Sequence, residues 1–166
     1  MYFRVMCFTF NVYYGKRLSN KGLDDFNWKI IQELQMNARI TIVEIGKRIN
    51  LSAPAVAERV KRLEEEGYIK GYRTIVDYDK LGLSVPVFIN YKATKISHGE
   101  MIKMVDKMPE VMEWYGITGA HCSMLKVIVA STRELETIIE KLQEFGETST
   151  SIILSSNTAP KIVRKK

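Results

Sequence analysis

Cysteine, histidine and proline are scarce in this sequence, and no apolar run in it is long. The two cysteines, Cys7 and Cys122, are too distant from each other to predict a disulfide framework or a metal site, so we expect free thiols in a reducing cytoplasm. No apolar stretch approaches the roughly 20 residues that a membrane span needs. The apolar N-terminus is interrupted by Arg4 and Asn11 and precedes no small-residue cleavage site, which argues against a signal peptide. We therefore expect a cytoplasmic protein with no cofactor, metal or membrane partner.

Basic residues outnumber acidic ones, but the excess lies at the two ends of the chain. The formal net charge of +6 and the pI near 9.3 are compatible with nucleic-acid binding. The basic residues of the two ends, where no acidic residue occurs, are Arg4, Lys16, Arg17, Lys21, Lys161, Arg164, Lys165 and Lys166. The segment from Leu23 to Ile75 holds nine basic and eight acidic residues. A DNA-binding surface must therefore come from local placement of charge.

The 166 residues suffice for two small domains, and the 46% hydrophobic content supports a packed core. We expect an α+β protein with an N-terminal extension (1–22), a DNA-binding domain (23–76), a linker (77–82), a second domain (83–156) and a basic tail (157–166). The extension has two interpretations. It is either a β-strand followed by a linker, or a poorly ordered extension, which includes the case of an upstream stretch added through a wrongly chosen start codon.

Three helices are predicted before Gly67. The first opens at Leu23-Asp24-Asp25, where acidic residues suit the helix dipole, and carries an apolar stripe of Phe26, Ile30, Ile31 and Leu34. Two more follow from 41 to 67, with apolar residues at helical spacing: Ile42, Ile45 and Ile49, then Val56, Val60 and Leu63. Asn50 can adopt the left-handed conformation of a tight turn between the two helices, and Gly46 allows the helices to cross closely. Ser52 is the expected N-cap of the second helix, and Pro54 lies in its first turn. This pattern predicts a helix-turn-helix, with an ordinary helical hairpin as the alternative.

The residues after Gly67 are β-formers. Tyr68, Ile69, Tyr72, Ile75 and Val76, with a turn at Gly71, predict a short hairpin, the wing of a winged helix. Lys70 and Arg73 would then contact DNA phosphates. The alternative is a connecting hairpin with solvated charges.

The second domain alternates strands and helices. We expect strands at 85–95, 111–118, 124–130 and 150–155, and helices at 100–108 and 132–145, with Ser131 as an N-cap. The order βαββαβ predicts a ferredoxin-like domain. Two apolar strand faces, Val87-Ile89-Tyr91 and Leu125-Val127-Val129, exceed what two helices are expected to cover. An uncovered face predicts sheet-to-sheet dimerisation.

With these residues in view, the chain from about Leu23 to Ser156 resembles the Lrp/AsnC (leucine-responsive, feast/famine) family of prokaryotic transcription regulators. The most specific stretches are LSAPAVAERVKRLEEEGYIKGYR and the linker DYDKLG, at 77–82. The resemblance implies sequence-specific binding of double-stranded DNA by a homodimer that assembles further, to a tetramer or octamer. It also implies modulation by a small amino acid bound between second domains.

The resemblance places an effector site at Thr118, Gly119, Ala120, His121 and Cys122. Family members that bind amino acids carry a Gly-x-x-Asp pattern there, and Cys122 takes the acidic position. A ligand ammonium loses a charge-assisted partner worth about 1.5–3 kcal/mol. This departure argues against binding of a free amino acid.

The second helix of the pair is the expected DNA reader. The DNA-binding candidates are Ser52, Ala53, Pro54, Ala57, Glu58, Arg59, Lys61 and Arg62, together with Lys70 and Arg73. Its first turns offer only apolar contacts, apart from Glu58, which can accept from cytosine; Arg59 and Arg62 suit phosphates. This distribution predicts modest base readout and strongly salt-dependent binding.

Two alternatives stay open. Some proteins similar to this family decarboxylate siroheme, using histidines and basic residues of the second domain. Here His98 and His121 are the only histidines, and no carboxylate pair, nucleophile triad or phosphate loop accompanies them, so we predict no catalytic residue. The other alternative is an architectural protein that wraps DNA without an effector, in keeping with a reader helix poor in long donors.

Overall fold

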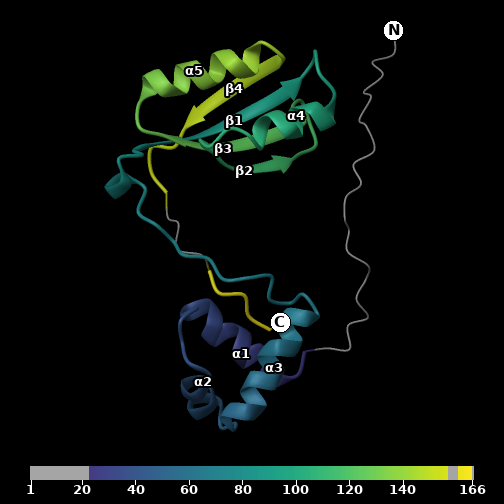
Figure 1. Ribbon diagram of the computed structural model, residues 1–166, viewed down its shortest axis with the longest axis vertical. Helices are drawn as coiled ribbons and strands as arrows, with labels where there is room; N and C mark the ends of the chain where they lie inside the picture. Colours follow the sequence, from purple (N-terminus) through teal and green to yellow (C-terminus); the bar gives the residue numbers. More distant parts are fainter. Residues whose placement is uncertain (1–22, 157–160, 166) are drawn as a thin grey trace. The chain divides into compact units, whose positions relative to one another are not determined.

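The computed structural model describes residues 23–156 and 161–165, which form two compact units (Figure 1). The first unit contains residues 23–74 together with the tail residues 161–165. The second begins at Ile75 and holds the remaining described residues. Both interpretations of residues 1–22 lie outside the described residues.

Three helices build the first unit: α1 (Asp25–Met36), α2 (Ile42–Ile49) and α3 (Ala53–Glu65). Each begins at a side-chain N-cap, supplied by Asp24, Thr41 and Ser52 in turn. Their apolar stripes meet in one core made of Ile30, Ile40, Ile45, Ile49, Val56, Val60 and Leu63. The three predicted helices are therefore confirmed, although Phe26 of the predicted stripe stays 36% exposed.

The turn between α2 and α3 has the geometry that a helix-turn-helix requires. Asn50 has a φ of 58° and a ψ of 47°, the left-handed conformation expected of it. Gly46 is buried, and a Cβ on it would lie 2.5 Å from the carbonyl oxygen of Leu51. The turn can therefore pack down on α2 only because residue 46 has no side chain.

The two strands of the predicted wing hairpin do not form. No strand lies between the end of α3 and Val85, where β1 begins. The chain leaves α3 through Gly67, with a φ of 76°, and continues without regular structure to the short 3₁₀ helix η1 (Asp79–Leu81). Tyr72, Ile75 and Val76 are 50%, 75% and 41% exposed. β-Forming side chains make a strand only where a second strand pairs with them, and within the described chain these residues have none.

The second unit has the predicted βαββαβ order. Its elements are β1 (Val85–Ala93), α4 (His98–Val105), β2 (Val111–Gly116), β3 (Ser123–Val129), α5 (Thr132–Gln143) and β4 (Gly146–Ile152). The sheet is antiparallel throughout, in the order β2-β3-β1-β4. The predicted last strand, 150–155, starts and ends too late. β4 opens with Gly146-Glu147-Thr148-Ser149, a polar stretch in which strand periodicity is hidden.

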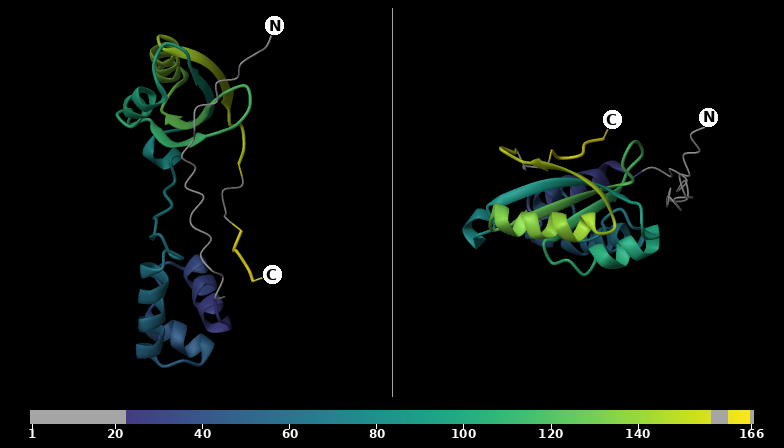
Figure 2. Two further views of the ribbon diagram at one scale, coloured as in Figure 1. Left: turned by 90° about the vertical axis from the view of Figure 1, so that its right-hand side faces the viewer. Right: turned by 90° about the horizontal axis from the view of Figure 1, so that it is seen from above.

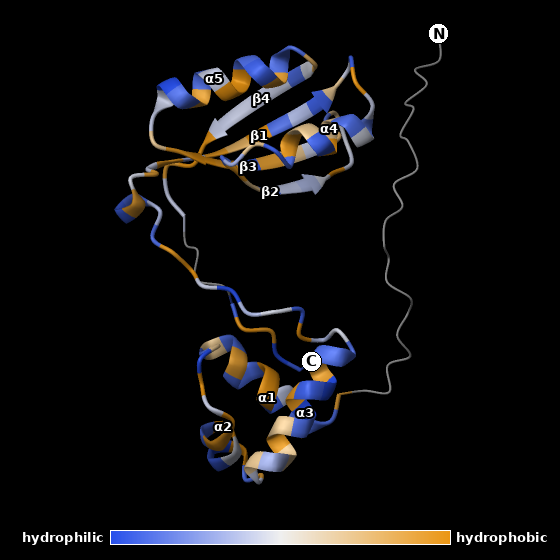
Figure 3. Cartoon of the chain, viewed as in Figure 1, coloured by the Kyte–Doolittle hydropathy of each residue, from blue (hydrophilic) through white to orange (hydrophobic). Residues whose placement is uncertain are grey.

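Both α-helices of this unit pack on one face of the sheet (Figures 1 and 2). The side chains beneath them include both predicted apolar strand faces, Val87, Ile89, Tyr91, Leu125, Val127 and Val129, all of them fully buried. The expectation that the two helices leave these faces uncovered is wrong. Figure 3 shows orange, hydrophobic segments in β1 and β3. The face without helices carries the alternate residues, among them Phe88, Asn90 and Lys126, which are half-buried.

Candidate DNA-binding surface and effector loop

The outward face of α3 carries most of the predicted DNA-binding residues. Pro54, Ala57, Glu58, Lys61 and Arg62 are exposed, whereas Ala53 is half-buried. The hydroxyl of Ser52 accepts a hydrogen bond of 3.4 Å from the Ala55 amide, so it serves as the N-cap and anchors the start of the helix. The exposed face of α3 therefore carries mostly short side chains in its first turns, followed toward its C-terminal end by two basic residues, Lys61 and Arg62.

Arg59 turns away from this outward face. Its guanidinium donates to the Asp24 carboxylate at 2.6 Å and to the Asn27 side-chain oxygen at 2.9 Å. It also lies over the ring of Phe26, with 5.5 Å from the guanidinium carbon to the ring centroid. Arg59 therefore ties α3 to α1, and its role as a phosphate contact stays a prediction. At 100° per residue it lies about 60° from Val56, which signals a position beside the core.

Asp24 is a junction between the two helices. One carboxylate oxygen accepts from the Asn27 amide at 2.7 Å to cap α1, and the other accepts from Arg59. Partial burial raises the pKa of Asp24, but the Asn27 hydrogen bond and the Arg59 guanidinium together outweigh it and hold that pKa below its ordinary value. The sequence identified Asp24 as a helix-dipole residue but not as the partner of Arg59.

Lys61 and Arg62 carry intrahelical ion pairs on the solvent side. Lys61 lies 3.8 Å from Glu65 and Arg62 lies 3.6 Å from Glu66, each one turn along the helix. The two basic side chains are 68% and 67% exposed. Pairs of this kind contribute little, about 0.3–0.5 kcal/mol, so phosphates can displace the glutamates at small cost.

Lys70 and Arg73 are exposed, on the extended segment after α3 instead of on a hairpin. Tyr72 fixes that segment, because its hydroxyl donates to Glu64 on α3 at 2.8 Å. Burial, followed by the Glu64 hydrogen bond and charge, raises the pKa of Tyr72 to about 12. Tyr72 is thus a positioning residue that sequence reasoning assigned only to a strand.

A second arginine joins α2 to α1. Arg48 donates to Glu33 at 2.7 Å and to Glu44 at 2.8 Å, and these two carboxylates raise its pKa above the ordinary value. Arg48 thus attaches α2 to α1, as Arg59 attaches α3 to α1. Neither arginine is therefore simply a solvated charge.

The predicted effector residues share one loop between β2 and β3. The Ile117 amide donates to the Cys122 carbonyl at 3.0 Å and closes the loop, and Gly119 has a φ of 123°. Thr118, Gly119, Ala120 and Cys122 are exposed, and His121 is half-buried. On the strands that lead into the loop, Glu113 lies 3.5 Å from Lys126 and accepts from the Tyr115 hydroxyl. The loop itself contains no carboxylate.

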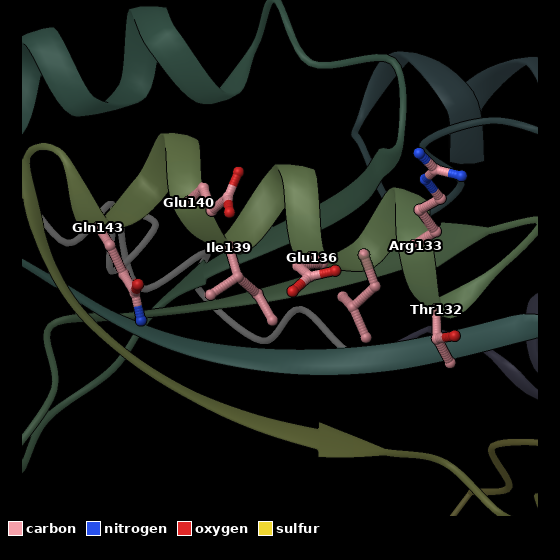
Figure 4. Close-up of a pocket in the computed structure, with 7 residues that line it drawn as sticks. Thr132, Arg133, Glu136, Ile139, Glu140 and Gln143 are labelled. Carbon is pink, nitrogen blue, oxygen red and sulfur yellow. The ribbon is translucent and has the colours of Figure 1, made fainter.

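A surface pocket elsewhere in the second unit follows α5 (Figure 4). Its lining residues are Thr132, Arg133, Leu135, Glu136, Ile139, Glu140 and Gln143. None of the predicted site residues lies among them. Within the described residues, no three side chains of His, Cys, Asp or Glu are grouped to hold a metal ion, and no helix is long and apolar enough to cross a membrane.

Comparison with known proteins agrees with this division of the chain. A family model for winged helix-turn-helix DNA-binding domains matches residues 23–70, and a model for the Lrp/AsnC ligand binding domain matches residues 85–160. The sequence is 36% identical over 136 residues to the uncharacterized HTH-type transcriptional regulator YezC of Bacillus subtilis, covering 82% of this chain and 96% of that protein. The chain belongs to the Lrp/AsnC family of transcription regulators. The fold predicted from the resemblance is confirmed.

Solved structures of this family superpose on the chain. The structure of LrpC from Bacillus subtilis has a TM-score of 0.78 and 34% identity, covering 82% of this chain and 97% of that one. A transcriptional regulator from Neisseria meningitidis, solved in complex with L-Met, has a TM-score of 0.76 and 25% identity, covering 84% of this chain and 97% of its own. These Lrp/AsnC relatives are named as regulators, so they favour neither the enzyme alternative nor the architectural one.

Proposed function

We propose that this member of the Lrp/AsnC family regulates transcription by inserting α3 into the major groove of DNA. The observation that carries the proposal is the outward face of α3. Capping by Ser52 and the tight turn at Asn50 leave Pro54, Ala57 and Glu58 exposed at the leading end, where a recognition helix meets base edges. Lys61 and Arg62 follow on the same side.

Readout of bases by this surface is modest. Pro54 and Ala57 can contact thymine methyl groups, and Glu58 can accept from the amino group of cytosine. Most of the affinity then comes from phosphates, contacted by Lys61, Arg62, Lys70 and Arg73. We expect binding that weakens steeply with salt and depends on DNA shape at positions that the protein does not touch.

We further propose that the working form is a homodimer, able to assemble to a tetramer or octamer. Its support is a set of exposed apolar side chains that precede and follow the strands of the sheet in the chain. Ile75 and Val76 precede β1 in the chain and are 75% and 41% exposed, Ile152 ends β4 at 48% exposure, and Leu154 follows it at 94%. Apolar side chains at such exposure mark association surfaces, and a second copy presents the same surface in return.

The loop from Thr118 to Cys122 is the proposed effector site. The relative solved with L-Met supports a small ligand for this kind of domain. In this chain the loop offers backbone amides, His121 and the Cys122 thiol but no carboxylate for an ammonium group. We therefore propose that an effector is held mainly through groups other than a free amine.

The test is selection of bound sites from random double-stranded DNA at about 50 and 200 mM salt, followed by affinity measurement on the selected sites. We expect enriched sequences with a loosely defined consensus and a loss of affinity of about 10³-fold or more between the two salt concentrations if six or more phosphates are contacted. Affinity that barely changes over this range contradicts the phosphate-led interface. Failure to enrich any DNA contradicts DNA binding by the chain.

A further inference from the structure

The described part of the basic tail, residues 161–165, lies on the first unit, against α1 (Figure 1). The backbone of Val163 makes two hydrogen bonds with one side chain, that of Gln35. Its amide donates to the Gln35 side-chain oxygen at 3.0 Å, and its carbonyl accepts from the Gln35 side-chain nitrogen at 3.4 Å. Because the N–H and the C=O of Val163 both bond to the Gln35 side chain, this pair of hydrogen bonds fixes which residue of the tail lies beside Gln35.

A second contact joins the tail to the opposite end of α1. The Lys165 ammonium lies 2.6 Å from the carboxylate of Asp25, the first residue of the helix. That ammonium holds the pKa of Asp25 below its ordinary value. Gln35 belongs to the last turn of α1, so the two contacts clasp the helix near both of its ends.

The contact at Asp25 adjoins the junction between α1 and α3. Asp25 directly follows Asp24, the residue that caps α1 and binds Arg59 of the proposed recognition helix. The backbone at residues 24 and 25 is therefore held by α3 on one side and by the tail on the other. The tail in turn continues from β4 of the second unit along the chain.

We propose that residues 161–165 form a latch that connects the end of β4 to α1 and, through the Asp24–Arg59 junction, to the recognition helix α3. The latch provides a second connection between the units besides the linker, covalent from β4 to the tail and non-covalent from the tail to α1, by which a change at the sheet of the second unit reaches the DNA-binding unit. Each contact is exposed and individually weak, as a reversible latch requires. The coupling to DNA rests on the proposed DNA-binding function, but the latch itself does not.

The latch is tested in the full-length protein without DNA by hydrogen exchange of α1. Lys165→Ala removes the ion pair and Gln35→Ala removes the amide pair, and ending the chain after Ser156 removes both. Arg164→Ala is the matched control, because it takes the same charge from the neighbouring residue of the same tail. We expect exchange across 25–36 to rise about two- to fivefold in the first three variants and to stay unchanged in the control. Equal exchange in all four proteins, or equal effects of the two tail cations, overturns the latch.

A DNA titration against salt separates the latch from a DNA-contacting arm. Loss of a phosphate contact lowers the slope of log Kobs against log salt by about 0.9, whereas loss of a latch leaves the slope unchanged. We expect unchanged slopes for Gln35→Ala and Lys165→Ala, with affinities shifted in the same direction. A lower slope for Lys165→Ala together with unaltered exchange of α1 overturns the latch and makes the tail a phosphate-binding arm.

Discussion

The guanidinium of Arg59 on α3 lies 2.6 Å from the carboxylate of Asp24, the N-cap of α1. This ion pair links the proposed recognition helix to the helix that supports it, beside the apolar core that both helices share. The same carboxylate caps α1, so the start of α1 and the placement of α3 depend on one side chain.

The Asp24 junction predicts a graded pair of variants. Asp24→Asn keeps a capping oxygen and loses the ion pair, whereas Asp24→Ala loses both. We expect a loss of about 0.5 kcal/mol for the first, since the pair is partly exposed, and about 1–2 kcal/mol for the second. Exchange of the core amides of Ile45 and Val60 measures the unfolding free energy of this unit alone. Identical losses in the two variants contradict the dual role.

The depressed pKa of Asp24 predicts a pH dependence. Its stabilising contribution is present above the unfolded-state pKa, about 3.8, and is lost as pH falls through the lower folded-state value. The stability difference between wild type and Asp24→Asn should therefore be full at pH 6 and shrink below pH 4. A difference that persists undiminished at pH 2 excludes the ion pair as its source.

On the DNA surface, Lys61→Ala and Arg62→Ala should each lower the salt slope by about 1 and weaken binding uniformly across sequences. Lys103→Ala and Lys141→Ala, exposed lysines of α4 and α5, are the charge-matched controls and should change neither quantity. Fluorescence anisotropy on a selected site measures both. If Lys103→Ala or Lys141→Ala lowers the affinity and the salt slope as much as Arg62→Ala does, the DNA-binding surface is not the outward face of α3.

Gly46→Ala should strongly destabilise the helix-turn-helix. The added Cβ would lie 2.5 Å from a backbone oxygen that has no rotamer to change, so the turn itself must shift, at a cost of about 1–3 kcal/mol. Gly99→Ala, in the first turn of α4, is the control because a Cβ there meets nothing within 4 Å. We expect that substitution to be neutral or stabilising by up to about 1 kcal/mol. Comparable destabilisation at both positions, from exchange of core amides, contradicts the close approach at Gly46.

Cys122→Asp tests the effector loop. The new carboxylate restores a charge-assisted partner for a ligand ammonium, worth about 1.5–3 kcal/mol, or a gain of roughly 10- to 150-fold in affinity. Calorimetric titration with L-methionine should show tighter binding by the variant than by the wild-type protein. Tighter binding by the wild type would mean that the loop already holds an ammonium group without an acidic side chain.

The first unit was predictable from sequence largely because its signals are local. The helix cap at Ser52, the left-handed Asn50 and the spacing of Ile45, Ile49 and Val56 each specify geometry within a few residues. The partner of Arg59 was not predictable in this way, since Asp24 lies 35 residues away in the chain. The helical phase of Arg59 beside Val56 indicated its inward side but could not name its partner.

The second unit shows where pattern reading stops. Alternation in β1 and β3 identified their apolar faces but not whether two helices provide enough area to cover them. β4 was misplaced because Glu147, Ser149 and Ser151 give it a polar composition, and only its pairing with β1 defines it. The hairpin strands expected after α3 do not form for the opposite reason: strand-forming residues from Tyr72 to Val76 lack a pairing segment in the described chain.

The polar composition of β4, an edge strand, also limits how copies of this protein can assemble through pairing of their sheets. β4 and β2 are the two outer strands of the sheet, with hydroxyl and carboxylate side chains on one and an irregular register between Val111 and Glu113 on the other. Hydrated, irregular borders discourage strand-by-strand extension of a sheet. We therefore expect copies that meet through the exposed apolar segments to close into finite symmetric particles instead of extending as fibres.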